Sequence, residues 1–120
     1  MKKTYAILAS IAALGGNPVG MKTIAYNTSQ GAVLTFTRAL AGEWGVHGIT
    51  VNAICPGTVA TAMVKNTYND ADVENQLKNM LLGRLGDPEE IAAAVVYYAS
   101  TESGFVTGNM HDINGGGYFG

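Results

Sequence analysis

The stretch Ile49-Thr50-Val51-Asn52-Ala53-Ile54, followed by Cys55-Pro56-Gly57, decides the fold of this chain. Isoleucine, threonine and valine branch at Cβ and favour extended backbone. A short run that is apolar almost throughout, rather than alternating with polar residues, is typical of a strand covered on both faces. Pro56 and Gly57 predict a loop directly after it. We therefore expect a buried strand over residues 49–54.

The residues before this strand have the spacing of an amphipathic helix. Large apolar side chains recur three or four positions apart: Val33, Phe36, Leu40 and Trp44. This spacing places them on one face of a helix. Gly45 and Gly48 follow at the position where helices commonly end. The pattern predicts a helix over residues 26–44.

A second helix is predicted to begin at Asp87 and to continue to residue 99. Aspartate is a favoured N-cap residue, and Pro88 fits the first helical turn because its missing N–H is not needed there. Two glutamates follow and interact favourably with the positive end of the helix dipole. The apolar residues 91–99 then supply a buried face.

The remaining segments complete an alternating order of strands and helices. Residues 5–9 form an apolar run that ends at Ser10, and residues 105–113 have weaker strand character. Residues 58–85 are mixed in polarity and predict short helices that could act as a lid. This order predicts an α/β fold with about three parallel strands, two main helices and short lid helices. The first strand would have one unpaired edge.

Composition excludes several classes of function. The 120 residues are 48% hydrophobic and 13% charged, which predicts one globular unit. A net charge of −2 without a basic run argues against nucleic-acid binding, and no apolar stretch is long enough to span a membrane. Cys55 is the only cysteine, so no intrachain disulfide forms, and we interpret it as a packed, unreactive thiol. His47 and His111 do not form a ligand cluster, so no metal site is predicted.

Tyr26 and Gln30 lie four residues apart at the start of the first predicted helix and so share one face. Together with Ser10 before them and the run Pro56-Gly57-Thr58-Val59-Ala60-Thr61 after them, they resemble the classical short-chain dehydrogenase/reductase (SDR) family. The family's Tyr-x-x-x-Lys motif reads Tyr26-Asn27-Thr28-Ser29-Gln30 here. Residues 38–43, 48–57, 83–91 and 107–108 resemble the same family, and residues 15–18 resemble its gluconate 5-dehydrogenase-like branch.

The resemblance implies a partial Rossmann-type (doubly wound) fold and an NAD- or NADP-dependent oxidoreductase that acts on an alcohol or carbonyl. Tyr26 would exchange a proton with the substrate oxygen, and Ser10 would hydrogen-bond that oxygen. The nicotinamide side of the cofactor would contact four residues of the loop after the buried strand. These residues are Pro56, Gly57, Val59 and Thr61. The resemblance also implies a cytoplasmic homo-oligomer.

Gln30 stands where the family has its catalytic lysine. The lysine's charge favours ionisation of the tyrosine, because a free phenol has a pKa of about 10. Glutamine can donate a hydrogen bond but has no charge. At an effective dielectric near 20, a unit charge about 4 Å away contributes roughly 4 kcal/mol, so its loss costs up to about a thousandfold in rate. We expect little or no activity.

No G-x-G-x-x-G motif opens a predicted helix in this chain, so the dinucleotide-binding half of the family is expected to be missing from residues 1–120, and we do not expect this chain alone to bind the cofactor. Two alternatives remain open. The chain could be a non-catalytic remnant that self-associates or binds full-length relatives. It could also be a small secreted protein, because the basic start and the apolar residues 5–14 imitate a signal peptide. Residues 15–23 differ from a phosphate-binding P-loop by the extra residue Met21, and Pro18 removes one of the amides such a loop needs, so nucleotide hydrolysis is not expected.

Overall fold

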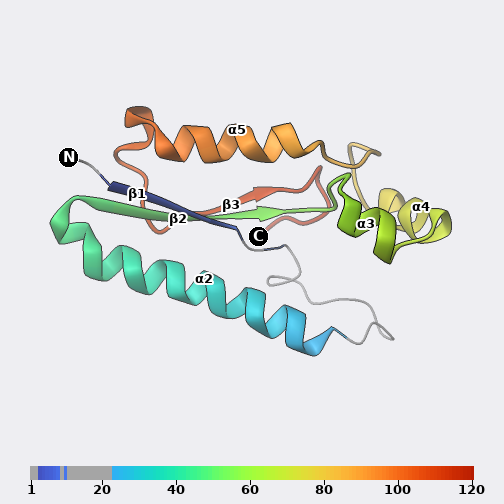
Figure 1. Ribbon diagram of the computed structural model, residues 1–120, viewed down its shortest axis with the longest axis horizontal. Coiled ribbons are helices and arrows are strands. Elements are labelled where there is room, and N and C mark those ends of the chain that lie inside the picture. Colours follow the sequence, from blue (N-terminus) through green and yellow to red (C-terminus); the bar gives the residue numbers. More distant parts are fainter. Residues whose placement is uncertain (1–2, 9, 11–22) are drawn as a thin grey trace.

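The computed structural model describes residues 3–8, 10 and 23–120 and has the predicted α/β architecture. Three parallel strands, β1 (Lys3–Leu8), β2 (Ile49–Pro56) and β3 (Met110–Ile113), pair in the order β1-β2-β3. The long helix α2 (Ile24–Trp44) covers one face of the sheet, and α5 (Pro88–Ala99) covers the other (Figure 1). Residues 15–20, which belong to the segment that is similar to a P-loop, lie outside the described part of the chain.

β2 is the central strand, and it is buried as its sequence predicts. Lys3 to Leu8 pair with Ile49 to Ile54 on one side, and Ala53 to Pro56 pair with Met110 to Ile113 on the other. Residues 51–55 are all buried. A strand with neighbours on both edges and helices on both faces has no solvent-facing side chains, which explains the continuous apolar run.

Successive residues of β2 serve two different halves of the core. Ala53 and Cys55 pack with Leu34 of α2, and Met110 lies against this group. Ile54 points the other way and packs with Ala94 and Tyr98 of α5. Full burial of an isoleucine side chain stabilises a fold by about 1.5–3 kcal/mol, so β2 ties both helices to the sheet.

Buried polar groups secure α5 and the last strand. The Asn52 side chain, fully buried, donates to the carbonyl of Val106 (3.0 Å) and accepts from the amide of Asn109 (3.1 Å). The Tyr98 hydroxyl accepts a hydrogen bond from the Asn109 side chain (2.7 Å) and lies 3.1 Å from Nδ1 of His111. Each of these side chains therefore has a partner, which avoids the cost of leaving a buried polar group unpaired.

The same contacts correct the predicted extent of the last strand. The prediction of a strand over residues 105–113 was too long, because β3 contains only Met110–Ile113. Gly108 has φ +70°, which interrupts extended backbone. The side chain of Asn52 then satisfies backbone groups that a regular strand ladder would otherwise pair.

The helices largely confirm the sequence predictions. α2 begins at Ile24, two residues before the predicted start, and ends at Trp44, and a single 3-10 turn, η1 (Gly45–His47), follows it. α5 begins with Pro88 in its first turn. Residues 58–85 contain two short helices, α3 (Ala62–Thr67) and α4 (Asp70–Lys78), and η2 (Thr101–Ser103) follows α5. The lid function predicted for residues 58–85 stays a prediction.

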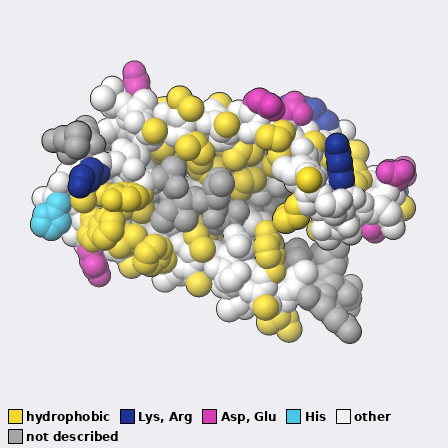
Figure 2. Space-filling view, viewed as in Figure 1, with side chains coloured by type: hydrophobic (Ala, Val, Ile, Leu, Met, Phe, Trp, Pro, Cys, Tyr) yellow, Lys and Arg dark blue, Asp and Glu magenta, His cyan; other side chains and the backbone are white. Residues whose placement is uncertain are grey.

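Much apolar side-chain surface is exposed, as Figure 2 shows for one face, where charged side chains lie mainly at the rim. The exposed large hydrophobic residues include Ile24, Phe36, Val96 and Phe105. None of the helices in the described residues is both long and apolar enough to cross a membrane.

Candidate active site

Pro56, the last residue of β2, and the loop that follows it carry the four predicted cofactor contacts, and Gly57 begins this loop under tight constraint. A Cβ atom at Gly57 would lie 2.8 Å from Cα of Asn114, which is closer than real Cβ atoms approach backbone. The Gly57 amide donates to the carbonyl of Ile113 (2.9 Å). Only glycine lets these two segments approach so closely, so the loop departs from the sheet at a fixed point.

Val59 lies in the middle of this loop and forms an isolated parallel bridge with Gly86. The bridge uses the carbonyl of Thr58, which accepts from Gly86 N–H (3.0 Å), and the amide of Ala60, which donates to the Gly86 carbonyl (2.9 Å). In this pattern the N–H and C=O of Val59 itself point away from Gly86. Within residues 23–120, neither group has a hydrogen-bond partner. Val59 therefore presents an open backbone edge.

The two threonines of the loop anchor it to the short helices. The Thr58 hydroxyl donates to Oε1 of Gln76 in α4. Thr61 is the N-cap of α3, and its hydroxyl accepts from the amide of Val64 (3.4 Å). Pro56, Gly57, Val59 and Thr61 are all partly exposed. The predicted cofactor-side residues therefore lie together at the carboxyl end of the central strand and on the accessible loop after it, the usual place for ligands in open α/β sheets.

The predicted catalytic residues come from two other segments. Ser10 lies two residues beyond β1 and is partly buried. Tyr26 and Gln30 lie in the first two turns of α2, with Tyr26 44% exposed and Gln30 partly buried. Figure 1 shows that the start of α2 and the loop after β2 lie toward the same end of the sheet.

The structure does not join these residues into a hydrogen-bonded set. Among the described residues, the side chains of Tyr26 and Gln30 make no hydrogen bond to each other or to residues 56–61. The Ser29 hydroxyl donates to the carbonyl of Tyr26 (2.8 Å) and not to a catalytic group. The assignment of catalytic roles therefore stays a prediction.

A cavity of about 80 Å³ adjoins the loop at Thr58. Its lining includes Thr58, Gly86, Glu90, Ile113 and Asn114. Ligand pockets usually measure about 300–1,000 Å³, so this cavity is too small for a nucleotide. A cofactor would have to meet the loop from its exposed side.

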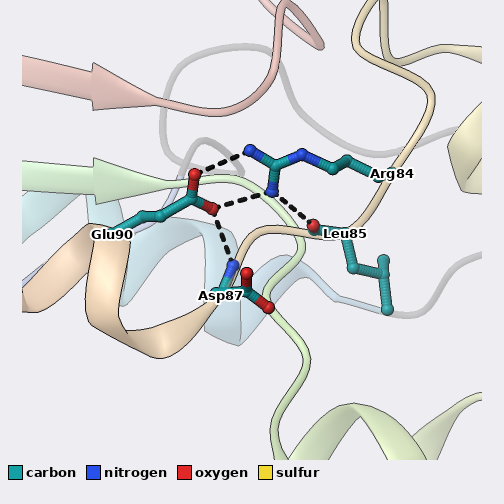
Figure 3. A network of polar contacts seen from close by, with 4 residues as sticks. All are labelled: Arg84, Leu85, Asp87 and Glu90. Atoms are coloured by element: carbon teal, nitrogen blue, oxygen red, sulfur yellow. Dashed lines mark hydrogen bonds and ion pairs between the residues drawn. The ribbon is translucent and has the colours of Figure 1, made fainter.

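Arg84 and Glu90 form an ion pair beside Gly86, the residue that bridges to the loop (Figure 3). The guanidinium of Arg84 donates to both carboxylate oxygens of Glu90 (2.6 and 2.8 Å) and to the carbonyl of Leu85 (3.1 Å). Glu90 also accepts from the amide of Asp87 (2.9 Å). These hydrogen bonds lower the pKa of Glu90 from 4.5 to about 2, the Arg84 side chain contributing most. The same contacts raise the pKa of Arg84.

Cys55 is buried directly before the loop and is not exposed to reagents. Burial raises the pKa of its thiol from 9.0 to about 11, and the nearby Asp112 carboxylate adds to the shift. Burial also raises the pKa of Asp112. A protonated, buried thiol is a poor nucleophile, in agreement with the interpretation of Cys55 as a packing residue. The described residues include no group of side chains arranged to hold a metal ion.

Sequence reasoning missed Arg84, Gly86 and Asn114 as parts of this region. Arg84 and Glu90 are six residues apart with a turn between them, so no helical spacing marks them as partners. Gly86 pairs with Val59, which is 27 residues away along the chain, and Asn114 lies against Gly57, which is 57 residues away. The run Asn114-Gly115-Gly116 predicted only a loop, although an Asn before glycines is a signal for a side-chain-capped turn, which the structure has.

The sequence profile of a family described as enoyl-(acyl carrier protein) reductase, one of the SDR groups, matches residues 1–117. The chain belongs to the short-chain dehydrogenase/reductase family. Acetoacetyl-CoA reductase of Shinella zoogloeoides is 39% identical over 98% of this SDR chain and 48% of its own. The 3-oxoacyl-(acyl-carrier-protein) reductase FabG of Vibrio harveyi is 37% identical, and the alignment covers 98% of this chain and 48% of FabG.

A solved structure from Brucella melitensis, described as a short-chain dehydrogenase/reductase of the glucose/ribitol dehydrogenase type, superposes with a TM-score of 0.87. It is 32% identical, and the alignment covers 98% of this SDR chain and 46% of the other chain. The chain thus spans about half the length of the relatives that it matches.

Proposed function

We propose that residues 1–120 form a single unit that supplies the catalytic side of an NAD(P)-dependent SDR oxidoreductase and lacks its dinucleotide-binding half. The observation that carries the proposal is the open backbone edge of Val59 on the loop after β2. An N–H and a C=O from one residue match the C=O and N–H₂ of a carboxamide. The family membership and the glycine contact that fixes the loop support the same conclusion.

The nicotinamide carboxamide would bind at Val59, with Pro56, Gly57 and Thr61 around it. When bound, the cofactor supplies or accepts the hydride. Tyr26 would exchange the proton of the substrate oxygen as general acid or base, and Ser10 would hold that oxygen. Gln30 would orient neighbours by hydrogen bonds but would bring no positive charge to the tyrosine. We therefore propose that turnover by this chain alone is absent or very slow.

The experiment is a comparison of two halves of the cofactor. Nicotinamide mononucleotide and AMP are titrated separately to millimolar concentration against the isotopically labelled chain, and amide resonances are followed. We expect nicotinamide mononucleotide to shift Val59 and Ala60, because their loop is present, and AMP to shift nothing, because its site belongs to the other half. The absence of any shift with nicotinamide mononucleotide, NADH or NADPH would overturn cofactor binding by this chain.

The substrate class that we propose is a small carbonyl compound, in the first place a 3-oxoacyl thioester. The names of the relatives, acetoacetyl-CoA reductase and 3-oxoacyl-(acyl-carrier-protein) reductase, support this choice. The likeness of residues 15–18 to the gluconate 5-dehydrogenase-like branch supports a sugar acid instead, and these residues lie outside the described part of the chain. Competing titrations with acetoacetyl-CoA and 5-ketogluconate, read at Tyr26, distinguish the two. A cytoplasmic location stays a prediction.

A second candidate function is association without catalysis, either with another copy or with a full-length relative. Two observations favour it. β1 pairs with β2 along one edge, and no described residue pairs with its other edge. Large apolar side chains such as Phe36 and Phe105 are exposed on the helices and the loop that surround the sheet. Open strand edges and apolar patches both promote oligomerisation. Light scattering across a concentration series tests it, since a monomer at every concentration would contradict self-association.

A further inference from the structure

Gly86, the residue that bridges to Val59, is held from both sides by one ion pair. On its N-terminal side, the carbonyl of Leu85 accepts from the Arg84 guanidinium (3.1 Å). On its C-terminal side, the amide of Asp87 donates to the Glu90 carboxylate (2.9 Å). Arg84 and Glu90 are joined to each other by two hydrogen bonds. The backbone of residues 85–87 is therefore fixed at two points that flank Gly86 (Figure 3).

Gly86 in turn sets the orientation of the cofactor-side loop. Both of its backbone groups are used on that loop, one on Thr58 and one on Ala60. These two bonds leave the N–H and C=O of Val59 facing outward. A rotation of the Gly86 peptide groups would break both bonds and would free Val59 to turn.

We infer that Arg84 and Glu90 are positioning residues, which hold Gly86 so that Val59 keeps its open backbone edge directed at the cofactor. The role ascribed to Val59 rests on the function proposed above, whereas the mechanical link from Arg84 and Glu90 to the loop does not. Among the described residues, neither Arg84 nor Glu90 makes a hydrogen bond to a predicted cofactor residue. Their effect passes through one glycine.

The geometry distinguishes this ion pair from an ordinary surface pair. Exposed pairs usually contribute little, because solvent screens them and two flexible side chains must be ordered. Arg84 and Glu90 are about half exposed, with side-chain exposures of 52% and 44%. However, the contact is bidentate, and each partner also bonds a backbone group. Bidentate, charge-assisted bonds fix geometry as well as supply energy. We therefore expect a local effect on the loop rather than a large effect on global stability.

The experiment is amide hydrogen exchange on four variants of the chain. Glu90→Gln removes the charge and one strong acceptor, Arg84→Met removes the guanidinium, and Arg84→Lys keeps the charge without the fork. Glu89→Gln is the matched control, because Glu89 is the neighbouring acid in the first turn of α5 and takes no part in the network. The amides of Ala60 and Gly86 report on the bridge, and the amide of Ala53, bonded to the Asn109 carbonyl, reports on the core.

We expect exchange at Ala60 and Gly86 to rise about threefold to tenfold in Glu90→Gln and Arg84→Met, with a smaller rise in Arg84→Lys and none in Glu89→Gln. Exchange at Ala53 should stay unchanged. Equal increases at all three amides would show a general loss of stability and would overturn the inference, as would no increase at the bridge. If Arg84→Met does not fold, Glu90→Gln and Arg84→Lys decide the outcome.

A second readout separates this inference from the proposed function. Nicotinamide mononucleotide should bind Glu90→Gln several-fold more weakly than the Glu89→Gln control. If it binds neither the variants nor the parent chain while Ala60 and Gly86 still exchange faster, the cofactor role of Val59 fails and the positioning of the loop stands. If binding is equal in both variants although the bridge has loosened, the link between the ion pair and the cofactor is wrong.

Discussion

At the scale of single residues, Gly57 shows how a backbone contact selects glycine. We expect Gly57→Ala to lower the free energy of unfolding by about 1–3 kcal/mol, because the new methyl group would lie 2.8 Å from Cα of Asn114 and force the two segments apart. Chemical denaturation measures the change.

The matched control for this substitution is Gly42→Ala. Gly42 lies within α2, and an added Cβ there meets no atom within 4 Å. Alanine is the better helix former, so Gly42→Ala should raise the free energy of unfolding by about 0.5–1 kcal/mol. Equal effects of the two alanines would mean that the approach of Asn114 does not constrain the loop.

Gln30 is the second position where one residue changes the expected chemistry. Gln30→Lys restores the positive charge of the family motif on the same helix face as Tyr26, but it does not supply the dinucleotide contacts that we propose residues 1–120 lack. We expect no turnover of acetoacetyl-CoA with NADH or NADPH, as followed by the absorbance of the reduced cofactor. Measurable turnover would show that the missing charge, and not the missing half, is the dominant defect.

Only one of these two positions could be understood from the sequence alone. Gln30 could be placed from the sequence because a four-residue spacing on a helix is a local property. The reason for Gly57 could not, because its neighbour Asn114 is 57 residues away and is brought close only by the pairing of β2 with β3. The position of the loop was predictable, but the contacts that shape it were not.

At the scale of elements, α5 is attached to the sheet through Tyr98. We expect Tyr98→Phe to destabilise the fold by about 1–3 kcal/mol, because the fully buried hydroxyl bonds Asn109 and lies beside His111, and its loss leaves polar groups unpaired. Thermal unfolding followed by circular dichroism measures this.

A control for Tyr98→Phe is available on the adjacent residue. Tyr97 is 42% exposed, so Tyr97→Phe should change stability little. If Tyr98→Phe were equally harmless, the hydroxyl network would not be what attaches α5 to β3.

The start of α5 has its own expected pH dependence. The pKa of Glu90 is about 2 in the folded chain and lies below its ordinary value of 4.5, because Arg84 and the Asp87 amide bond the carboxylate. The stabilising contribution of a depressed carboxyl pKa is complete above the unfolded pKa and disappears as pH falls through the folded one. Protection of the Gly86 amide should therefore hold above about pH 4.5 and fall toward pH 2. The Glu90→Gln variant, which lacks the titrating carboxyl group, is the reference curve.

Element types were the most predictable part of the fold. The regular spacing of apolar residues predicted α2, and the branched run predicted β2, because both patterns reflect burial within one element. The prediction for β3 was too long by five residues, since its length depends on the side chain of Asn52 from another strand. A residue that competes for backbone groups at long range leaves no mark in the local sequence.

At the scale of the whole molecule, Cys55 is a probe of global opening. The thiol is completely buried at the centre of the sheet, with a pKa of about 11. We expect a thiol reagent at about pH 8 to modify Cys55 only as fast as the chain unfolds. Because the folded pKa lies above the ordinary value of 9.0, folding favours the protonated thiol, and this contribution is lost as pH rises from about 9 through about 11. Rapid labelling of the native chain would contradict this burial.

The strand order has a consequence for how such a chain can be extended. β1, β2 and β3 are added in the order of the sequence and always on the same side, so the sheet grows in one direction. Every described pairing in the sheet lies on the β3 side of β1. New strands could therefore be joined to the outer edge of β1 without breaking any of these pairings. In engineering terms, this part of the chain is a cassette whose sheet can be extended at the β1 edge, suited to recombination with the sheets of its relatives.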